Sequence, residues 1–420
     1  MLYYNSPRWT NELLDCSMPM TFDTYSACSY NCLYCFAFFQ KSHSLGKKEG
    51  ESSNYQKNEV RPVNTEKIKA MFDPDYKGQF GSYIKNRFVM QWGGMADQFD
   101  ENERAQGKTL ELLKTLRKIN YPLCFSTKAT WFLKDDRYRE VFAGVENWDC
   151  KFSIINLDPQ RSRRMEVKVD SPQARLEAIK EYTKLTKSNA ILRLRPFIIG
   201  FTDREGEYLE LIKQARDAGA TAVTTEFLCL DGRADDKLKA RYNAMSKLTG
   251  YDILDFYKNN SNSTGYYRLT RKAKEPYVKK MKELCDKLGM RFYVSDAHFK
   301  EYSSNGSCCG LNESCNYSRG QFTEALIIAK TKGKVYFSDI RASAEKIFDG
   351  IHYERLEGYN IKTPTNRVKY KNYSTLDFFR SKWNNPNDAN SPYKYFGGVL
   401  KPIGLDDNKD VIYEYVGDKV

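Results

Sequence analysis

The chain has 420 residues, and its 67 Lys and Arg against 54 Asp and Glu leave a formal net charge of +13 at pH 7. With 41% hydrophobic and 29% charged residues it has the composition of a globular protein, long enough for two or three domains. No apolar run approaches the roughly 20 residues of a membrane span, and the N-terminus lacks the pattern of a signal peptide, so we expect a cytoplasmic protein with no membrane partner.

The positive charge and the eleven cysteines narrow the expected partners. Thiols in the cytosol stay reduced, so the cysteines are expected to be buried apolar residues or metal ligands. A basic excess favours a polyanionic partner, because phosphate neutralisation dominates the affinity of proteins for nucleic acid. Lysine is also common on ordinary surfaces, so charge alone leaves this partner as one of two interpretations.

The first motif along the chain is a group of three cysteines, Cys28, Cys32 and Cys35, separated by three and two residues. A loop of this length can bring three thiolates to one face of a cubic iron–sulfur cluster, whose full shell takes four. One iron would then remain open to another ligand. The alternatives are three unrelated thiols, or a zinc site completed by a distant ligand, although zinc sites favour paired C-x-x-C units.

Beyond a polar loop at 46–54, strand-like and helix-like stretches alternate. Strands are expected at 87–92, 121–126, 150–156, 191–198 and 221–228, and helices near 103–119, 134–142, 172–185 and 205–218. Ser171 and Pro172 are typical of the N-cap and first position of a helix. With a strand just before Cys28, the pattern makes six βα units and predicts an α/β protein with a parallel sheet.

The remainder of the chain has a different character. Helices are expected at 237–248 and 276–288, with a short strand at 290–295. From about residue 306 a cysteine-containing turn is followed by one expected helix, 321–330, and by a tail rich in Asn, Pro, Tyr and Gly. We therefore expect one domain over 1–305 and a C-terminal accessory module over 306–420.

Small and polar residues gather where the expected strands end. They are Gly93, Gly94, Ser126, Lys128, Ser153 and Asn156. Paired glycines let a backbone approach a ligand without a Cβ clash, and hydroxyl and ammonium groups suit polar ligand atoms. The alternatives are a tight strand–helix turn for the glycines and a helix N-cap for Ser126 or Thr127.

Arg195 places a guanidinium inside an apolar run that is expected to be buried. A buried arginine must be paired, and a ligand carboxylate would satisfy it with two hydrogen bonds. The alternative is a structural ion pair, for which Glu166 is the natural partner of either Arg175 or Arg195.

A second cysteine group comprises Cys308, Cys309 and Cys315. Together with Cys285 and His298, these residues could hold an auxiliary iron–sulfur cluster or a zinc ion. Alternatively, Cys309 or Cys315 could be a catalytic thiol that donates a hydrogen atom to a substrate radical. The third interpretation is a group of reduced structural thiols.

The cysteine loop, with Tyr34 before its last cysteine, resembles the cluster loop of the radical S-adenosylmethionine (SAM) superfamily. Five further motifs follow the loop along the chain. They are Gly-Gly-Met-Ala-Asp at 93–97, Ser-Thr-Lys at 126–128, Ser-Ile-Ile-Asn at 153–156, the stretch from Glu166 to Leu176, and Arg-Pro-Phe-Ile-Ile-Gly-Phe-Thr-Asp at 195–203. Over roughly residues 20–230 this order is similar to the spore photoproduct lyase-like branch, whose namesake repairs a thymine dimer in DNA.

The resemblance implies a partial (βα)6 TIM-type barrel in which Cys28, Cys32 and Cys35 hold a [4Fe-4S] cluster. SAM would bind the open iron and be cleaved reductively to a 5′-deoxyadenosyl radical that takes hydrogen from a substrate. Gly93, Gly94, Ser126, Lys128, Ser153, Asn156 and Arg195 would hold SAM. The motif departs from the family at Met95, where an acidic residue is usual, and Asp97 is the candidate replacement.

The substrate favoured by charge and resemblance is a nucleic acid or nucleotide, in a repair, lyase or other modification reaction. One alternative is a radical SAM enzyme that modifies a peptide or a small metabolite. Another, of a different class, is a non-catalytic nucleic-acid-binding protein with a structural iron–sulfur or zinc site. An enzyme of this kind would also need a reducing partner such as flavodoxin or ferredoxin.

Overall fold

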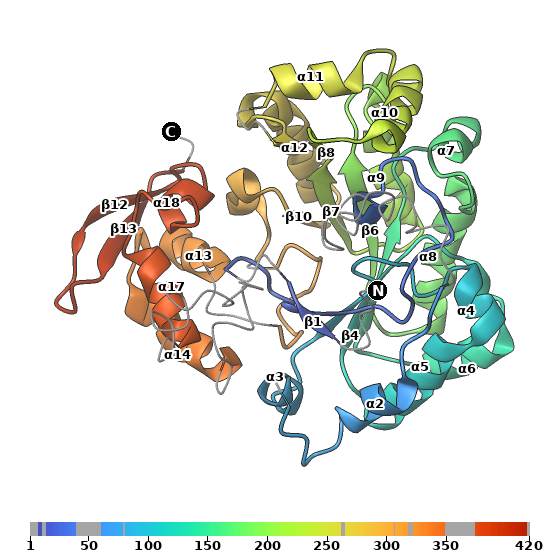
Figure 1. The fold of residues 1–420 in the computed structure, drawn as a ribbon, viewed down its shortest axis with the longest axis horizontal. Coiled ribbons are helices and arrows are strands. Elements are labelled where there is room, and N and C mark those ends of the chain that lie inside the picture. Colours follow the sequence, from blue (N-terminus) through green and yellow to red (C-terminus); the bar gives the residue numbers. More distant parts are fainter. Residues whose placement is uncertain are drawn as a thin grey trace. The chain divides into compact units, whose positions relative to one another are not determined.

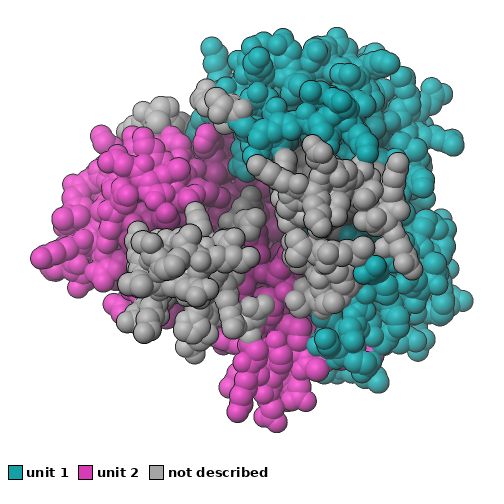
Figure 2. All heavy atoms as spheres, viewed as in Figure 1, with its two compact units in different colours: residues 1–6, 22–68, 92–292 teal, residues 7–21, 69–91, 293–420 magenta. Residues whose placement is uncertain are grey.

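A computed structural model describes residues 7–10, 14–38, 60–78, 80–261, 265–305, 307–317, 322–348 and 374–417. The expected loop at 46–54 lies outside these residues. The chain divides into two compact units: unit 1 comprises 1–6, 22–68 and 92–292, and unit 2 comprises 7–21, 69–91 and 293–420 (Figure 2). Compactness alone does not test the predicted domain division at residue 305, which stays a prediction.

An eight-stranded sheet has the strand order β1-β2-β3-β4-β5-β6-β7-β10. Its strands are β1 (Arg8–Trp9), β2 (Met20–Phe22), β3 (Met90–Trp92), β4 (Leu123–Thr127), β5 (Trp148–Ser153), β6 (Ala190–Phe197), β7 (Ala222–Phe227) and β10 (Arg291–Val294). Strands β4, β5, β6 and β7 pair in parallel, whereas β1 and β2 pair antiparallel. The predicted α/β fold with parallel strands, as in a partial TIM-type barrel, is confirmed.

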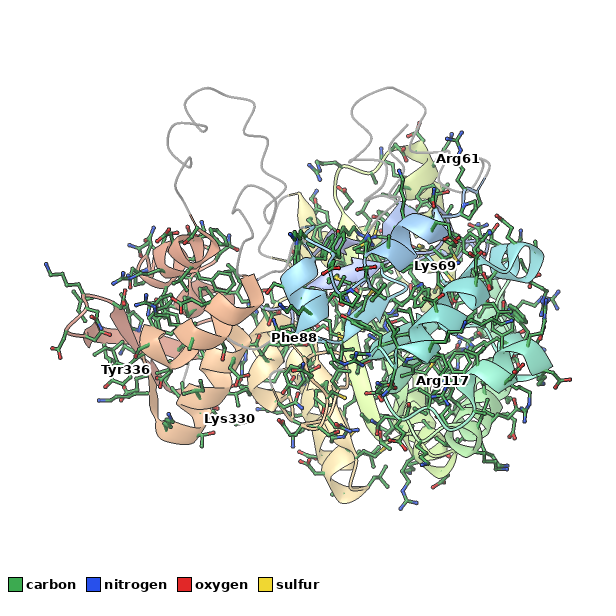
Figure 3. The ribbon with its side chains drawn as sticks, turned by 90° about the horizontal axis from the view of Figure 1, so that it is seen from below. Arg61, Lys69, Phe88, Arg117, Lys330 and Tyr336 are labelled. Atoms are coloured by element: carbon green, nitrogen blue, oxygen red, sulfur yellow. The ribbon has the colours of Figure 1, made fainter. Side chains whose placement is uncertain are left out.

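The helices of unit 1 follow its strands along the chain, as in βα units (Figure 1). They are α4 (Glu101–Gln106), α5 (Lys108–Lys118), α6 (Asp136–Phe142), α7 (Pro159–Met165), α8 (Pro172–Leu185), α9 (Glu207–Asp217), α10 (Asp236–Thr249), α11 (Ile253–Asn259) and α12 (Arg271–Lys287). Two of these helices are tied together where they end, because Arg117 of α5 donates a hydrogen bond to the Ala143 carbonyl after α6, at 3.0 Å (Figure 3).

The parallel strands of unit 1 have one apolar face and one face that is polar toward the strand ends. On one face the register pairs Thr127 with Phe152, Phe152 with Leu192, and Leu192 with Val223. Helix α8 packs on β5 and β6. On the other face the paired positions toward the strand ends are polar, since Ser153 lies beside Arg193 and Arg193 beside Thr224, whereas Ile191 and Ala222 pair on this face nearer the strand starts. Because successive residues of a strand alternate between faces, Ser126 and Lys151 lie on this face as well, and Arg195 reaches Glu226 beyond it.

Local sequence explains where these helices begin and break. Ser171 Oγ accepts a hydrogen bond from the Ala174 N–H at 3.1 Å, with Pro172 in the first turn, so the predicted helix 172–185 is confirmed. The single helix expected near 103–119 is instead two, α4 and α5. Gly107 adopts a left-handed conformation (φ 65°) between them, which ends one helix and starts the next.

A two-stranded antiparallel sheet pairs β8 (Cys229–Asp231) with β9 (Tyr266–Arg268) across α10 and α11, and α2 (Thr65–Ala70) precedes β3. The predicted helix 276–288 begins earlier, at Arg271, so Pro276 lies inside α12 as its sixth residue and not at its start.

Unit 2 includes residues 306–420, for which one helix is predicted, and the structure has several further elements there. Its elements include α3 (Gly81–Lys85), α13 (Phe322–Lys332), α14 (Phe337–Phe348), α17 (Thr375–Trp383), α18 (Pro392–Tyr395) and a three-stranded sheet of β11 (Lys334–Val335), β13 (Val411–Tyr415) and β12 (Leu400–Leu405). Lys330 of α13, labelled in Figure 3, donates a hydrogen bond to the Glu301 carbonyl.

The aromatic residues of the C-terminal tail form the core of unit 2. Trp383 is fully buried, its Nε1–H donates to the Val411 carbonyl at 2.6 Å, and its own carbonyl accepts from Tyr413 Oη at 2.6 Å. The expectation of one helix was wrong because the tail's apolar residues are aromatic and widely spaced, so their role appears only once they pack together. Among the described residues, no helix has the length and apolar character needed to cross a bilayer.

Candidate functional site

The cysteine loop begins a few residues after β2 and is attached to the end of α7. The Leu33 N–H donates to the Met165 carbonyl at 2.9 Å, and Cys32 forms an isolated β-bridge with Glu166. Cys32 is buried, whereas Cys28 and Cys35 are half-buried. These contacts give the backbone of the loop a defined position in unit 1.

Tyr34 ties the loop to a buried ion pair. Its hydroxyl donates to Glu166, and Glu166 Oε2 lies 2.7 Å from Arg175 Nη2, with both of these side chains fully buried. Arg175 also donates to the Ser153 carbonyl at 2.6 Å and to Ser162 Oγ at 3.0 Å. Burial opposes charge on Glu166, but Arg175, then the Lys128 ammonium and the Tyr34 hydroxyl, outweigh it and lower the pKa of Glu166. Of the two expected partners of Glu166, the structure therefore selects Arg175.

Arg195 has a different partner from the one expected. It forms an ion pair with Glu226 of β7, and its side chain is 30% exposed rather than buried. Beside it on the polar face of the sheet, Arg193 Nη1 donates to Ser153 Oγ at 3.2 Å. Any ligand carboxylate at Arg195 would have to share the guanidinium with Glu226.

Gly93 lies in a turn that only glycine adopts easily. Its φ is +87°, and an added Cβ would lie 2.2 Å from Gln98 Oε1 and 3.0 Å from the Ser126 carbonyl oxygen. Asp23 Oδ1 holds the same turn by accepting from the N–H groups of Met95 at 2.8 Å and Ala96 at 2.9 Å. Glycine is required at position 93 by the backbone and by neighbouring protein atoms, independently of any ligand.

Asp97 is the candidate replacement for an acidic residue at position 95, but its carboxylate already accepts hydrogen bonds from neighbouring protein groups. Its carboxylate accepts from Thr127 Oγ1 at 2.8 Å, the Lys128 N–H at 2.7 Å and the Phe99 N–H at 3.0 Å. Thr127 Oγ1 in turn accepts from the Ala129 N–H at 2.9 Å. These bonds give Asp97 and Thr127 a structural role at the end of β4.

Two buried amide side chains near the strand ends contain unsatisfied atoms. Asn156 is fully buried and donates to the Asp158 carbonyl at 2.9 Å, but its Oδ1 accepts no hydrogen bond from the described residues. Gln98 is 1% exposed, and neither polar atom of its amide has a partner among those residues. Because an unsatisfied buried acceptor is costly, a donor from a bound ligand is one way to satisfy Asn156. The polar groups at these strand ends thus fit a ligand with several donors and acceptors, such as SAM.

Cys28 and Cys32 lie in environments that favour the protonated thiol. Burial, followed by Asp100 and Asp97, raises the pKa of Cys28 well above its usual range. Burial raises the pKa of Cys32 to about 12, with Lys128 acting in the opposite direction. No group of three or more His, Cys, Asp or Glu side chains in the described ranges is already arranged to hold a metal ion. Three thiols on one loop suit iron or zinc as donors, and binding either metal would release their protons.

The second cysteine group shows no such arrangement either. The sulfurs of Cys308 and Cys309 are 3.7 Å apart, and Cys315 Sγ lies 3.5 Å from Asn312 Oδ1. Cys285 is buried on α12, as expected of a core thiol. Within the described part of the chain, these residues form no metal-binding group, so the auxiliary cluster or zinc ion is unsupported.

Sequence reasoning missed two residues that hold this region together, Asp23 and Arg241. Asp23 directly follows β2. An aspartate at the end of a strand does not indicate by itself which backbone N–H groups it will bind. Arg241 contacts the cysteine loop from α10, far along the chain. Nothing in the local sequence indicates to which neighbour an arginine on a helix surface points.

Comparison with known proteins leaves the family open. No family model matches the chain, and no curated protein matches it. A crystal structure of Streptococcus suis SuiB bound to precursor peptide SuiA aligns at 11% identity and a TM-score of 0.42, over 68% of this chain and 51% of that one. SuiB bound to S-adenosylmethionine aligns at 11% identity and 0.40, over 68% and 52%.

TYW1 with a lysine-pyruvate adduct bound aligns at 13% identity and a TM-score of 0.32, over 59% of this chain and 77% of that one. The chain spans about half the length of the SuiB structures that it matches. At this distance the likenesses do not assign the chain to a family.

Proposed function

We propose that the chain is a radical SAM enzyme in which Cys28, Cys32 and Cys35 hold a [4Fe-4S] cluster. The observation that carries the proposal is the C-x3-C-x2-C loop itself, held at a defined position by Met165 and Glu166. Three thiols are one fewer than a full cluster shell needs. A loop with three thiols therefore suits a cluster whose fourth iron binds a small molecule.

The remaining proposed residues would bind and orient SAM. They are Gly93, Gly94, Ser126, Lys128, Ser153, Asn156 and Arg195. When bound, the reduced cluster would supply the electron that cleaves SAM to a 5′-deoxyadenosyl radical. The Asn156 Oδ1 without a partner among the described residues and the half-exposed Arg195 guanidinium support a ligand with both donors and a carboxylate. Cys309 and Cys315 are proposed as thiols that could donate a hydrogen atom to a substrate radical.

For the substrate we propose a nucleic acid or nucleotide, and for the family the spore photoproduct lyase-like branch. The net charge of +13 supports the first, and the order of motifs over roughly residues 20–230 supports the second. A reducing partner such as flavodoxin or ferredoxin would supply the electron. A peptide or small metabolite as the substrate would leave the cluster and SAM chemistry unchanged.

The decisive experiment is anaerobic reconstitution with iron and sulfide, followed by reduction with dithionite in the presence of SAM. We expect bound iron with the electron paramagnetic resonance signal of a reduced [4Fe-4S] cluster, and formation of 5′-deoxyadenosine. The Cys32→Ala variant should lose both. The matched control is Cys229→Ala, which alters a half-buried thiol of the same unit and should keep both.

Three outcomes would contradict the proposal. A cluster without 5′-deoxyadenosine would favour the non-catalytic binding protein, as would stoichiometric zinc in place of iron. Retention of the cluster or of SAM cleavage by Cys32→Ala would refute the ligand assignment. For the substrate, binding to single- and double-stranded DNA and RNA should weaken steeply as salt rises, and a failure to bind at any salt concentration would favour a peptide or metabolite.

A further inference from the structure

Arg241 of α10 donates hydrogen bonds to three acceptors of the cysteine loop. Its Nε donates to the Leu33 carbonyl at 3.1 Å, its Nη1 to Asn31 Oδ1 at 3.0 Å, and its Nη2 to the Cys32 carbonyl. The guanidinium fork is planar and rigid, so three acceptors at these positions define one orientation of the loop relative to α10. Arg241 is 208 residues beyond Leu33 in the chain, so this contact depends wholly on the tertiary structure.

The position of Arg241 is itself well determined. Asp235 caps α10 by accepting from the Leu238 N–H at 2.8 Å, and Leu238, Tyr242 and Met245 are buried on one side of the helix. The Arg241 guanidinium carbon lies 4.4 Å from the centre of the Phe38 ring, which also belongs to unit 1. A side chain that is anchored at its helix and stacked on a ring loses little further entropy when it binds the loop.

The loop is thus held by two helices. Met165 and Glu166, at the end of α7, bind its backbone. Arg241 of α10 binds the carbonyls of Cys32 and Leu33. Asn31, just before Cys32, adopts φ +51°, a left-handed conformation that asparagine takes more readily than other non-glycine residues, and its side chain accepts from Arg241. The Arg241 contact therefore fixes the side chain of this turn residue between the first two cysteines.

Arg241 also places a positive charge beside two of the thiols. Its guanidinium donates to the backbone carbonyl of Cys32 and to that of Leu33, two residues before Cys35. Arginine stays protonated under ordinary conditions. A cluster with thiolate ligands becomes more negative when it gains an electron, so a fixed cation nearby stabilises its reduced form.

We propose that Arg241 is a positioning residue that holds the cysteine loop in place and raises the reduction potential of the cluster bound there. The inference rests on the proposed function, because the potential exists only if Cys28, Cys32 and Cys35 bind a cluster. The positioning role concerns the protein without its cluster and can be tested on its own.

The positioning role is tested by hydrogen–deuterium exchange of the full chain without metal. We expect peptides that cover the amides of Leu33 and Cys35 to exchange about tenfold faster in Arg241→Gln and Arg241→Lys, because charge-assisted hydrogen bonds are lost or misaligned. The matched control, Lys239→Gln, removes a charge from an exposed side chain of the same helix and should not alter this exchange. Unchanged exchange in both Arg241 variants would overturn the positioning role.

The electrostatic role is tested by redox titration of the reconstituted proteins, followed by electron paramagnetic resonance. We expect Arg241→Gln to shift the cluster to a more negative potential, Arg241→Lys to keep most of the wild-type potential because it keeps the charge, and Lys239→Gln to shift nothing. Equal potentials for the wild type and Arg241→Gln would overturn this role.

The two experiments separate failure of this inference from failure of the proposed function. A wild-type chain that takes up no cluster would refute the proposed function and the electrostatic role with it, while the exchange result would still decide whether Arg241 positions the loop. If Arg241→Gln does not fold, Asn31→Gly removes one of the three acceptors and tolerates the φ of +51° at this position, and it should accelerate exchange at Leu33 to a smaller extent.

Discussion

Glu166 and Arg175 form an ion pair, 2.7 Å between Oε2 and Nη2, in which neither side chain has any solvent exposure. The pair is surrounded by further hydrogen bonds, from Tyr34 to Glu166 and from Arg175 to the Ser153 carbonyl and Ser162. It therefore joins the cysteine loop, the end of α7, α8 and β5. Such bonds stabilise a buried charge pair by satisfying its lone pairs and protons, although the Arg175 Nε–H has no acceptor among the described residues.

Replacing Glu166 by Gln should destabilise unit 1 strongly. The change leaves the buried Arg175 charge without its counter-ion, which costs about 3–5 kcal/mol in the free energy of unfolding. Urea denaturation of the two proteins side by side measures the difference. Glu146→Gln is the matched control, because Glu146 pairs with Lys187 at 2.8 Å while both side chains are about 70% exposed, and it should cause no measurable change. Equal stability of wild type and Glu166→Gln would show that the pair contributes nothing.

The same pair predicts a dependence of stability on acid. The folded-state pKa of Glu166 is lowered, so its contribution is complete above the ordinary glutamate pKa of about 4.3 and is lost as the pH falls through the lower, folded value. We expect the stability of the wild type to fall more steeply than that of Glu166→Gln below about pH 4.3. Parallel stability curves of the two proteins from pH 5 downward would contradict this.

Gly93→Ala should lower the free energy of unfolding more than Gly107→Ala does. Gly107 has φ +65° with no atom within 4 Å of an added Cβ, so Gly107→Ala tests backbone strain alone, about 1–2 kcal/mol. At Gly93 the Cβ would also meet Gln98 and the Ser126 carbonyl. We expect a larger loss of unfolding free energy for Gly93→Ala, partly recovered in the double variant Gly93→Ala with Gln98→Ala. No recovery would place the clash at the Ser126 backbone instead.

If Arg195 binds the SAM carboxylate, Arg195→Gln should weaken SAM binding. Loss of a charged hydrogen-bonding partner, worth about 1.5–3 kcal/mol, corresponds to a roughly 10- to 150-fold higher Kd, measurable by equilibrium dialysis. Arg233→Gln is the matched control, since Arg233 pairs with Asp231 but its side chain is 67% exposed and carries no proposed role. An unchanged Kd in Arg195→Gln would show that Arg195 serves only its ion pair with Glu226.

Much of the barrel could be predicted because its strands and helices depend on the spacing of apolar residues and on helix caps, which are properties of neighbouring residues. The helix 172–185 with its Ser171 cap was found to the residue, and the strands of unit 1 were found within a few residues. Most elements of the C-terminal region were not predicted. Its core forms where residues such as Trp383 and Tyr413, about 30 positions apart, come into contact, and no regular spacing of apolar residues indicates such a core in the sequence. The break at Gly107 was also missed, since a single glycine within a helical pattern is often tolerated.

The amino-acid sequence by itself determined the spacing of Cys28, Cys32 and Cys35, the alternation of strands with helices and the polar residues at the strand ends, because all of these are properties of neighbouring residues. Only the tertiary structure decided which partners the charged residues take: Arg175 rather than Arg195 for Glu166, Glu226 for Arg195, and the cysteine loop for Arg241. A charged side chain on a helix or strand can reach several acceptors, and the packing of distant segments selects one of them.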